Sequence, residues 1–402
     1  MRAWATNAGR LIAALVLALA APRAASAADL RRGFEAAAAL DAELRSIEAQ
    51  RAVVAARQAR AGALLPGAPI IGAGYRSDHV TGNRGLREFE GEIDMPVWLP
   101  GESRSLREAA IAQAAALEAR AVRRRLLLAG EVRDAWWAWT VAGAERDAQT
   151  ERVALARALE RDVARQVRAG HLPEADLAVA TADLRDAESA LRARGLAVRD
   201  AALAFRSLTG VLPSAGPAEA PAVGGEDDPR LAAPRAQVEA GRAAERLARV
   251  RDRANPEVGL QLRYERDAFG EPWGTRLLLR VSLPLQNPPA WREQIAAARA
   301  EVTTASAELA TAGRTVAGGV DRARAVRATA LALVETTEAR YAALARQARL
   351  YEESYRLGQQ PLIEVVRVRV QRADADAARR RARAEAGRAE SLLNQALGML
   401  PR

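Results

Sequence analysis

Two kinds of hydrophobic periodicity divide the chain. Residues 69–100 and 256–288 each contain two short stretches in which apolar and polar residues alternate, the pattern of half-buried β-strands. Elsewhere the apolar residues, mostly Ala and Leu, recur at helical spacing. The predicted helices cover residues 29–61, 104–169, 174–208, 230–254, 291–357 and 362–397. The chain is therefore expected to be mainly α with a small β part.

The helices over residues 104–169 and 291–357 are too long for a compact domain. The first contains no proline, and at 1.5 Å per residue it would extend on the order of 100 Å. Its return helix repeats apolar residues every seven positions, which is typical of a coiled coil, with Arg194 as the one misfit on the neighbouring seam. The repeating positions are Leu177, Leu184, Leu191, Val198 and Phe205.

The two halves of the chain have glycines and prolines at corresponding positions. Gly170 corresponds to Gly358, and Pro173 corresponds to Pro361, in one unbroken register. Such an internal repeat predicts two similar units. We expect a first repeat over residues 28–210, a Pro/Gly/Ala linker over 211–229 and a second repeat over 230–402.

The predicted strands separate polar from apolar side chains. In one strand Phe89, Gly91, Ile93, Met95 and Val97 fall on one face, and in another the apolar set runs from Leu277 to Leu285. Strands of this length with one charged face are typical of transmembrane barrels, although a soluble half-buried sheet gives the same alternation. The charged positions expected to line a wet lumen are Glu88, Glu90, Glu92, Asp94, Arg263, Arg276 and Arg280.

The N-terminus has the order of a secretory signal peptide over residues 1–27, with Arg2 and Arg10, an apolar run over 11–21 and Ala25-Ser26-Ala27. The chain has no Cys, so neither a disulfide nor a lipid on an N-terminal Cys is expected. The formal net charge of +10 comes from Arg spread among acids, which favours solvated helix faces and no nucleic-acid partner. The exported chain then either stays periplasmic or crosses the outer membrane as strands.

Four strands per chain cannot close a membrane-spanning sheet. Lipid cannot satisfy an open sheet edge, and the smallest bacterial barrels have about eight strands, so several chains must share one barrel. Two chains would supply eight strands and three would supply twelve. In each half the two shorter helices, end to end, match the long one, so the duplicated coiled-coil helices could form a hollow periplasmic α-barrel continuous with the shared β-barrel.

The turns V-R-A-G-H-L-P-E-A-D-L and Y-R-L-G-Q-Q-P-L-I-E-V-V, together with the duplicated strand pairs, resemble the TolC-like outer-membrane efflux factors. The resemblance implies a homotrimer in outer-membrane lipid that conducts substrates passively. It also implies a periplasmic adaptor and an inner-membrane pump as partners. The short chain, ending at Arg402, and its stretch M-P-V-W-L-P-G-E are similar to the heavy-metal (CzcC/CusC-like) branch.

The resemblance also implies a gate near the turns. Tyr355 corresponds to the family's lock tyrosine and Asp176 to its carboxylate partner, so a hydrogen bond between them is a hypothesis for the closed state. Tyr355 could equally be a packing aromatic. Glu364 corresponds to an acidic ring position, whereas Gln360 and Arg367 depart from the family pattern. In a trimer a ring of Arg367 side chains would be repulsive unless each pairs with Glu364, three residues away on the same helix face.

The resemblance places adaptor docking at the turn tips. The expected docking residues are Arg168, Gly170, Pro173, Arg356, Gly358 and Pro361. A simpler interpretation is that the glycines only permit the turn conformation, and both can hold. Trp136, Trp137 and Trp139 are expected to pack at the middle of the helices, where the linker would wrap.

No catalytic, metal-binding or cofactor-binding constellation is found in the sequence. His79 and His171 fall in predicted loops, and the carboxylates lie opposite Arg at helical spacing. An enzyme is therefore not expected. The alternatives are a soluble periplasmic coiled-coil scaffold or an adaptor protein, neither of which explains two amphipathic strand pairs placed identically in the two halves.

Overall fold

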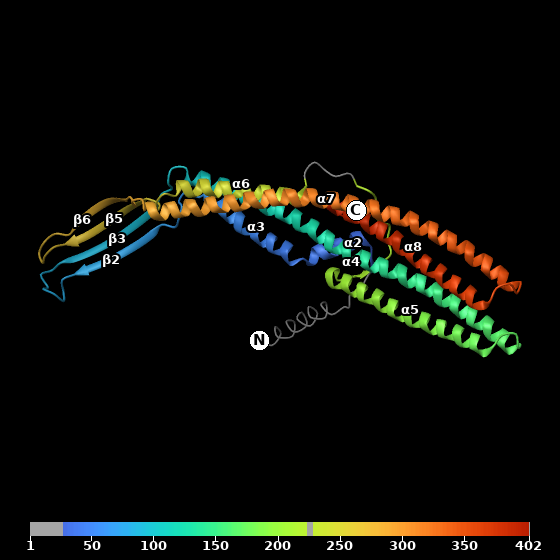
Figure 1. Ribbon diagram of the computed structural model, residues 1–402. Helices are drawn as coiled ribbons and strands as arrows, with labels where there is room; N and C mark the ends of the chain where they lie inside the picture. The colour runs from blue at the N-terminus through green and yellow to red at the C-terminus, as the bar shows by residue number, and fades with distance from the viewer. Residues whose placement is uncertain (1–26, 223–227, 402) are drawn as a thin grey trace, which may run out of the picture. The chain divides into compact units, whose positions relative to one another are not determined.

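The computed structural model describes residues 27–222 and 228–401, and its elements follow the predicted order twice (Figure 1). The first series is α2 (Leu30–Leu40), α3 (Ala42–Ala61), β2 (Ile70–Ser77), β3 (Arg87–Pro96), α4 (Glu102–Arg168) and α5 (Glu174–Thr209). The second is α6 (Pro229–Val250), β5 (Glu257–Arg266), β6 (Gly274–Ser282), α7 (Pro288–Arg356) and α8 (Leu362–Ala396). The mainly helical fold with a small sheet is confirmed. The predicted signal peptide lies outside the described residues except for Ala27.

The prediction of one helix over residues 29–61 is wrong. Asp41 adopts an extended conformation, with φ −63° and ψ 122°, and separates α2 from α3. Asp29 begins α2 by accepting the backbone N–H of Arg32 at 2.9 Å. The two helices belong to different compact units, so the break serves tertiary packing that the Ala-rich composition conceals.

The chain forms two compact units, each built from both halves of the sequence. The sheet-bearing unit comprises residues 42–125 and 225–318, and the turn-bearing unit comprises residues up to 41, 126–224 and 319–402. The long helices α4 and α7 each continue from one unit into the other. Among the helices that the structure describes, none is both long enough and apolar enough to cross a membrane.

In the sheet-bearing unit the four strands pair in the order β2-β3-β5-β6, with all pairs antiparallel. The duplicated hairpins therefore meet through β3 and β5, and β2 and β6 form the two edges. The predicted strands were slightly too long: Val97 and Leu285 lie beyond the strand ends at Pro96 and Ser282. Proline lacks a donor for the ladder, which fits strand endings at Pro96 and just before Pro284.

The turn-bearing unit has a core of aromatic and small residues. Phe205 of α5 is fully buried against α2, where a Cβ on Gly33 would lie 2.5 Å from the Phe205 ring. Leu159 and Val163 of α4 pack on Ala180 of α5, which confirms the predicted coiled-coil seam. The predicted misfit Arg194 forms an ion pair of 2.7 Å with Glu145 of α4 instead of entering the seam.

The described part of the predicted linker, residues 211–222, packs on the turn-bearing unit. Its short strand β4 (Leu212–Pro213) pairs in parallel with β1 (Ala27–Ala28). The indole of Trp136 donates to the carbonyl of Ser214 at 3.2 Å, and Trp136 and Trp137 are buried. The interpretation as packing residues is confirmed for Trp136 and Trp137, and of these Trp136 contacts the linker; Trp139 is only partly buried. This segment therefore packs as an ordered part of the unit and does more than connect the two repeats.

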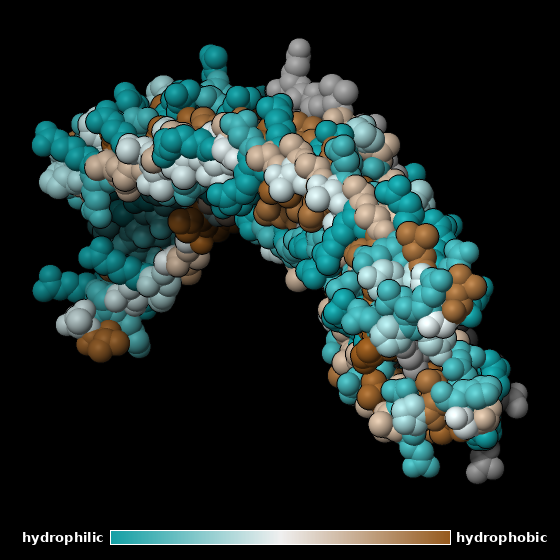
Figure 2. All heavy atoms as spheres, turned by 45° about the vertical axis from the view of Figure 1, so that its right-hand side comes forward, coloured by the Kyte–Doolittle hydropathy of each residue, from teal (hydrophilic) through white to brown (hydrophobic). Residues whose placement is uncertain are grey.

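Figure 2 shows that hydrophilic side chains predominate on the visible face of the molecule, with apolar side chains in small separate patches. This agrees with a sequence whose charged residues are spread along its helices. The visible face therefore offers no large continuous apolar area.

Candidate functional site

The polar face of the sheet is a ladder of ion pairs. Arg263 of β5 lies 2.6 Å from both Glu88 and Glu90 of β3. Arg280 of β6 lies 2.8 Å from Asp94 and 3.6 Å from Glu92. The acidic and basic residues predicted to share a face are thus brought together.

Arg276 has a partner that the sequence analysis left out. Its guanidinium lies 2.7 Å from Glu265 of β5, and Glu265 is directly opposite Glu88 in the register. Glu265 belongs to the charged alternation of β5, so the strand periodicity alone could have identified it. Each carboxylate from Glu88 to Asp94 and Glu265 therefore has an arginine partner on another strand of the sheet, and Arg280 of β6 reaches across β5 to Glu92 and Asp94.

Glycines make room for these carboxylates. Gly72 is opposite Glu92 and Gly259 is opposite Asp94 in the sheet register. A Cβ on Gly72 would lie 2.7 Å from the Glu92 side chain, and one on Gly259 would lie 2.1 Å from Asp94 Oδ1. The acidic side chains therefore lie flat across neighbouring strands, where only glycine permits this approach.

The opposite face of the sheet is apolar and has no cover in the described chain. Ile71 is 80% exposed, and Leu277 and Leu279 are 69% and 68% exposed. A soluble monomer rarely exposes a continuous apolar surface of this kind. One face thus suits a hydrophobic medium and the other suits water.

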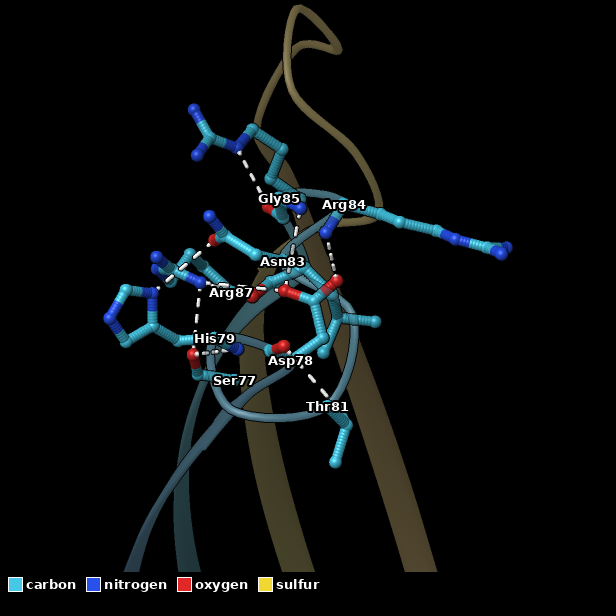
Figure 3. A network of polar contacts seen from close by, with 10 residues as sticks. Ser77, Asp78, His79, Thr81, Asn83, Arg84, Gly85 and Arg87 are labelled. Carbon is cyan, nitrogen blue, oxygen red and sulfur yellow. Dashed lines mark hydrogen bonds and ion pairs between the residues drawn. The ribbon is translucent and has the colours of Figure 1, made fainter.

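The loop between β2 and β3 is organised by Asp78 (Figure 3). Its carboxylate accepts the backbone N–H groups of Arg84 at 2.5 Å and Gly85 at 3.4 Å, and it lies 3.6 Å from Arg87. Burial acts to raise the pKa of Asp78, but the backbone hydrogen bonds outweigh it, so this pKa is lowered from its ordinary value. The loop is held by an ionised carboxylate.

This loop is joined to the loop between β5 and β6. The N–H of Phe269 donates to the carbonyl of Arg84 at 2.9 Å, and Arg266 Nε donates to the carbonyl of Gly85 at 3.3 Å. Gly85 has φ +108°, and a Cβ there would lie 2.3 Å from the Phe269 nitrogen. The two hairpin loops therefore form one ordered cap over the end of the sheet.

In the turn-bearing unit, Tyr355 has a different partner from the one expected. Its hydroxyl donates to Gln166 Oε1 of α4 at 2.9 Å, and no hydrogen bond joins it to Asp176 among the described residues. The backbone N–H of Asp176 bonds the carbonyl of Pro173 at 3.1 Å, as part of the start of α5. Gln166 was missed because the resemblance directed attention to the other side of the turn. In the sequence, Gln166 is only a polar residue in the last turn of a long helix, and nothing else distinguishes it.

Of the other predicted gate residues, Gln360 lies just before α8, and Glu364 and Arg367 lie in its first two turns. Glu364 and Arg367 form an ion pair on one helix face, at 2.6 Å, which is the pairing that an Arg367 ring would require. Arg367 is largely exposed, with 62% of its side-chain surface accessible, so this pair is screened by water. Gln360 lines the same groove as Gln166 and Tyr355.

The two tips of the helical hairpins have the same backbone conformation. Gly170 has φ +76° and Gly358 has φ +74°, and each donates its N–H to a carbonyl three residues earlier at 2.9 Å. Pro173 and Pro361 then precede α5 and α8 in extended conformation. Arg168 and Arg356 are the last residues of α4 and α7, where a cation complements the helix dipole. The structure accounts for the turns, and adaptor docking at them stays a prediction.

A buried arginine ties the linker to the rest of the turn-bearing unit. Arg133 of α4 is 1% exposed and forms a bidentate pair with Glu219 at 2.8 and 2.7 Å. It also donates to Gln395 of α8 and, at 3.0 Å, to the carbonyl of Met399. Next to it, Trp137 donates to the Ser391 hydroxyl at 2.8 Å. This cluster could not be predicted from the sequence, because Arg133 is one of many arginines on a long helix.

The described residues contain no group of three His, Cys, Asp or Glu side chains arranged to hold a metal ion. The acidic side chains of the sheet are paired with arginines, which suits a lining better than an acid/base pair. The sheet thus presents one ion-paired polar face and one exposed apolar face.

Comparison with known proteins agrees with this geometry. Residues 226–399 match the model of the outer membrane efflux protein family. No curated protein matches the chain as a whole by sequence.

Solved structures with the same fold cover nearly the whole chain. A membrane protein from Pseudomonas aeruginosa is 19% identical, with a TM-score of 0.73 over 93% of this chain and 91% of that one. The outer membrane protein VceC from Vibrio cholerae is 16% identical, with a TM-score of 0.71 over 92% and 96% of the two chains. CusC, whose structures describe transmembrane channel formation, is 16% identical, with a TM-score of 0.74 over 92% of each chain. The chain thus has the fold of these membrane proteins, and its second repeat matches the outer membrane efflux protein family.

Proposed function

We propose that this protein is the outer-membrane channel of a tripartite efflux system and conducts its substrates passively. The observation that carries the proposal is the sheet of β2, β3, β5 and β6. It has an exposed apolar face, an ion-paired polar face and, at β2 and β6, two edges without a strand partner in the described chain. A lipid environment would cover the first face, and water in a lumen would solvate the second.

Copies of the chain would supply the missing edge partners. Unpaired backbone groups at β2 and β6 are costly in lipid, so β2 of one copy would pair with β6 of the next. Three copies would give a barrel of twelve strands, wide enough for a lumen that the ladder around Arg263 and Arg280 could line. The similarity to solved outer-membrane channels supports this arrangement.

The helical hairpins would extend the lumen on the other side of the membrane. In this proposal, α4 with α5 and α7 with α8 form a periplasmic tunnel, and the turns at Gly170 and Gly358 meet the adaptor of an inner-membrane pump. The Tyr355–Gln166 bond and the Glu364–Arg367 pair would then belong to its gate. Such a conduit needs no catalyst and no cofactor.

Within the outer-membrane efflux factors, the chain is assigned in this proposal to the heavy-metal branch. The assignment is supported by M-P-V-W-L-P-G-E and by the similarity to CusC. The stretch also has a packing role, because Trp98 donates to the carbonyl of Ala63 at 3.0 Å and Glu102 accepts from Asn255 at 2.6 Å at the joint between strand and helix. Loss of metal resistance after deletion of the gene, with drug resistance unchanged, would support this branch, and the reverse pattern would exclude it.

A soluble periplasmic scaffold is the competing function. It would place the apolar face of the sheet against another protein. Reconstitution of the purified full chain in a planar lipid bilayer separates the two. The channel proposal predicts discrete conductance steps that scale with protein concentration, whereas a chain that is recovered without detergent and gives no steps would be a scaffold.

A further inference from the structure

A row of aromatic side chains crosses the apolar face of the sheet at its loop end. Tyr75, Phe89 and Tyr264 are directly opposite one another in the register, and they are 59%, 50% and 44% exposed. Trp273 extends the row by stacking on Tyr264, with ring centroids 4.7 Å apart and planes at 12°. If the sheet spans a membrane, such a row marks the depth where acyl chains meet headgroups.

The next row on the same face is polar and basic. Two residues further along each strand, Ser77, Arg87 and Arg266 are opposite one another. Two residues of a strand correspond to about 7 Å, so this row lies at headgroup depth, just beyond the aromatic rings. Two arginines placed directly opposite each other repel unless anions accompany them.

Within the part of the chain that the structure describes, only one of these two arginines has a carboxylate partner. Arg87 lies 3.6 Å from Asp78 and donates to the Ser77 hydroxyl at 2.9 Å. Among the described residues, no carboxylate forms an ion pair with Arg266, although Asp267 and Glu271 follow it in the same loop. Arg266 is therefore the cation of this row that lacks a counter-ion.

Arg266 is nevertheless held in place. Its Nε donates to the carbonyl of Gly85, and its guanidinium lies over the rings of Trp273 at 5.2 Å and Phe269 at 5.5 Å. Stacking on rings and one hydrogen bond fix the guanidinium plane while leaving its two terminal nitrogens to donate in that plane. A planar pair of donors fits two oxygens of a phosphate group.

We infer that Arg266, fixed by Trp273 and Phe269, binds the phosphate of a lipid headgroup in the leaflet at the loop end of the sheet. The inference rests on the proposed function, since it requires the apolar face to meet lipid. The occupant is a lipid because the guanidinium lies on the apolar face, directly beyond the aromatic row. Such a lipid would complete the counter-charge at the rim and hold the two docked loops at a fixed depth.

The test uses the full chain purified in non-ionic detergent and titrated with phosphatidylglycerol. Native mass spectrometry counts the bound lipid, and diacylglycerol with the same acyl chains is the phosphate-free probe. We expect phosphatidylglycerol to bind and diacylglycerol to bind at least tenfold more weakly. Arg266→Gln should lower the affinity for phosphatidylglycerol about tenfold. Arg266→Lys keeps the charge without the planar donors, so its affinity should lie between those of the wild type and Arg266→Gln.

Arg84→Gln is the matched control. Arg84 is in the adjacent loop, its side chain is exposed, and it points away from the Asp78 cluster (Figure 3). Its replacement should change lipid affinity less than about twofold. Equal losses for both variants, no loss for Arg266→Gln, or inorganic phosphate binding as tightly as the lipid would overturn the inference. Because binding is measured in detergent, these outcomes are independent of the bilayer conductance that tests the proposed function.

Discussion

The hydroxyl of Tyr355 donates a hydrogen bond of 2.9 Å to Gln166 Oε1, which joins α7 of the second repeat to α4 of the first. The two residues are 189 positions apart in the sequence and lie near the tips of the two helical hairpins. This bond therefore links the hairpins that would have to separate if the proposed channel opens at its periplasmic end.

Removing this bond should favour opening. A neutral hydrogen bond contributes about 0.5–1.5 kcal/mol, so Tyr355→Phe should raise the open fraction roughly two- to twelvefold. Gln166→Ala should give a change of similar size, and Asp176→Asn should give little change because Asp176 does not contact the hydroxyl. Single-channel recordings of the three variants measure this. If Asp176→Asn raises the open fraction and Gln166→Ala does not, Tyr355 is held by Asp176 and not by Gln166.

The buried pair of Arg133 and Glu219 should be costly to break. Arg133→Ala leaves the carboxylate of Glu219 buried without its partner, which typically costs about 3–5 kcal/mol. The control is Arg146→Ala, because Arg146 and Asp147 form an exposed ion pair on the same helix. There the free energy of unfolding should fall by no more than about 1 kcal/mol. Thermal unfolding followed by circular dichroism compares the two. Equal stability would show that the linker is not held by this cluster.

Gly259 should not tolerate a side chain. In Gly259→Ala the new Cβ would meet Asp94, displace it from Arg280 and strain β5, at a cost of about 1–3 kcal/mol. Gly91→Ala is the matched control in the same sheet, because a Cβ at Gly91 meets no atom within 4 Å. The temperature at which the assembled oligomer dissociates on a gel should fall for the first variant only. A fall of equal size for both would mean that loss of glycine itself weakens the strands.

The cap around Asp78 should loosen in acid. Because the pKa of Asp78 is lowered in the folded protein, its stabilising effect is complete above the ordinary aspartate pKa and is lost as the pH falls through the folded value. Hydrogen exchange of residues 78–86, corrected for intrinsic rates, should show constant protection from pH 7 to about 5 and a decrease below about pH 4. Asp78→Asn should lack most of this protection throughout. Protection that persists to pH 3 in the wild type would assign the loop's order to other contacts.

The sequence predicted the elements and the faces of the strands because both depend on local periodicity. Alternation placed Arg263 and Arg280 on the face of Glu90 and Asp94, and helical spacing placed Glu364 and Arg367 on one helix face. Contacts between distant segments could not be obtained in this way. Gln166 with Tyr355 and Arg133 with Glu219 depend on how helices pack, and many arginines and glutamines occupy equivalent local positions.

The break at Asp41 was hidden for a related reason. Local propensity favours a continuous helix through residues 29–61, and only the division of α2 and α3 between two compact units requires a break there. Periodicity describes what each segment can bury. It does not say where the partner is.

In the proposed channel, β2 of one copy pairs with β6 of the next to close a shared barrel. The absence of Cys makes a disulfide test clean, and β2 and β6 are opposite edges of the sheet within one chain. Cysteines replacing Ile71 of β2 and, in separate variants, Leu277, Leu279 or Val281 of β6 sample the possible registers on the apolar face. In oxidised membranes we expect, for at least one pair, a ladder on a non-reducing gel that ends at three chains. Only single chains for every pair, in protein recovered from the outer membrane, would contradict it.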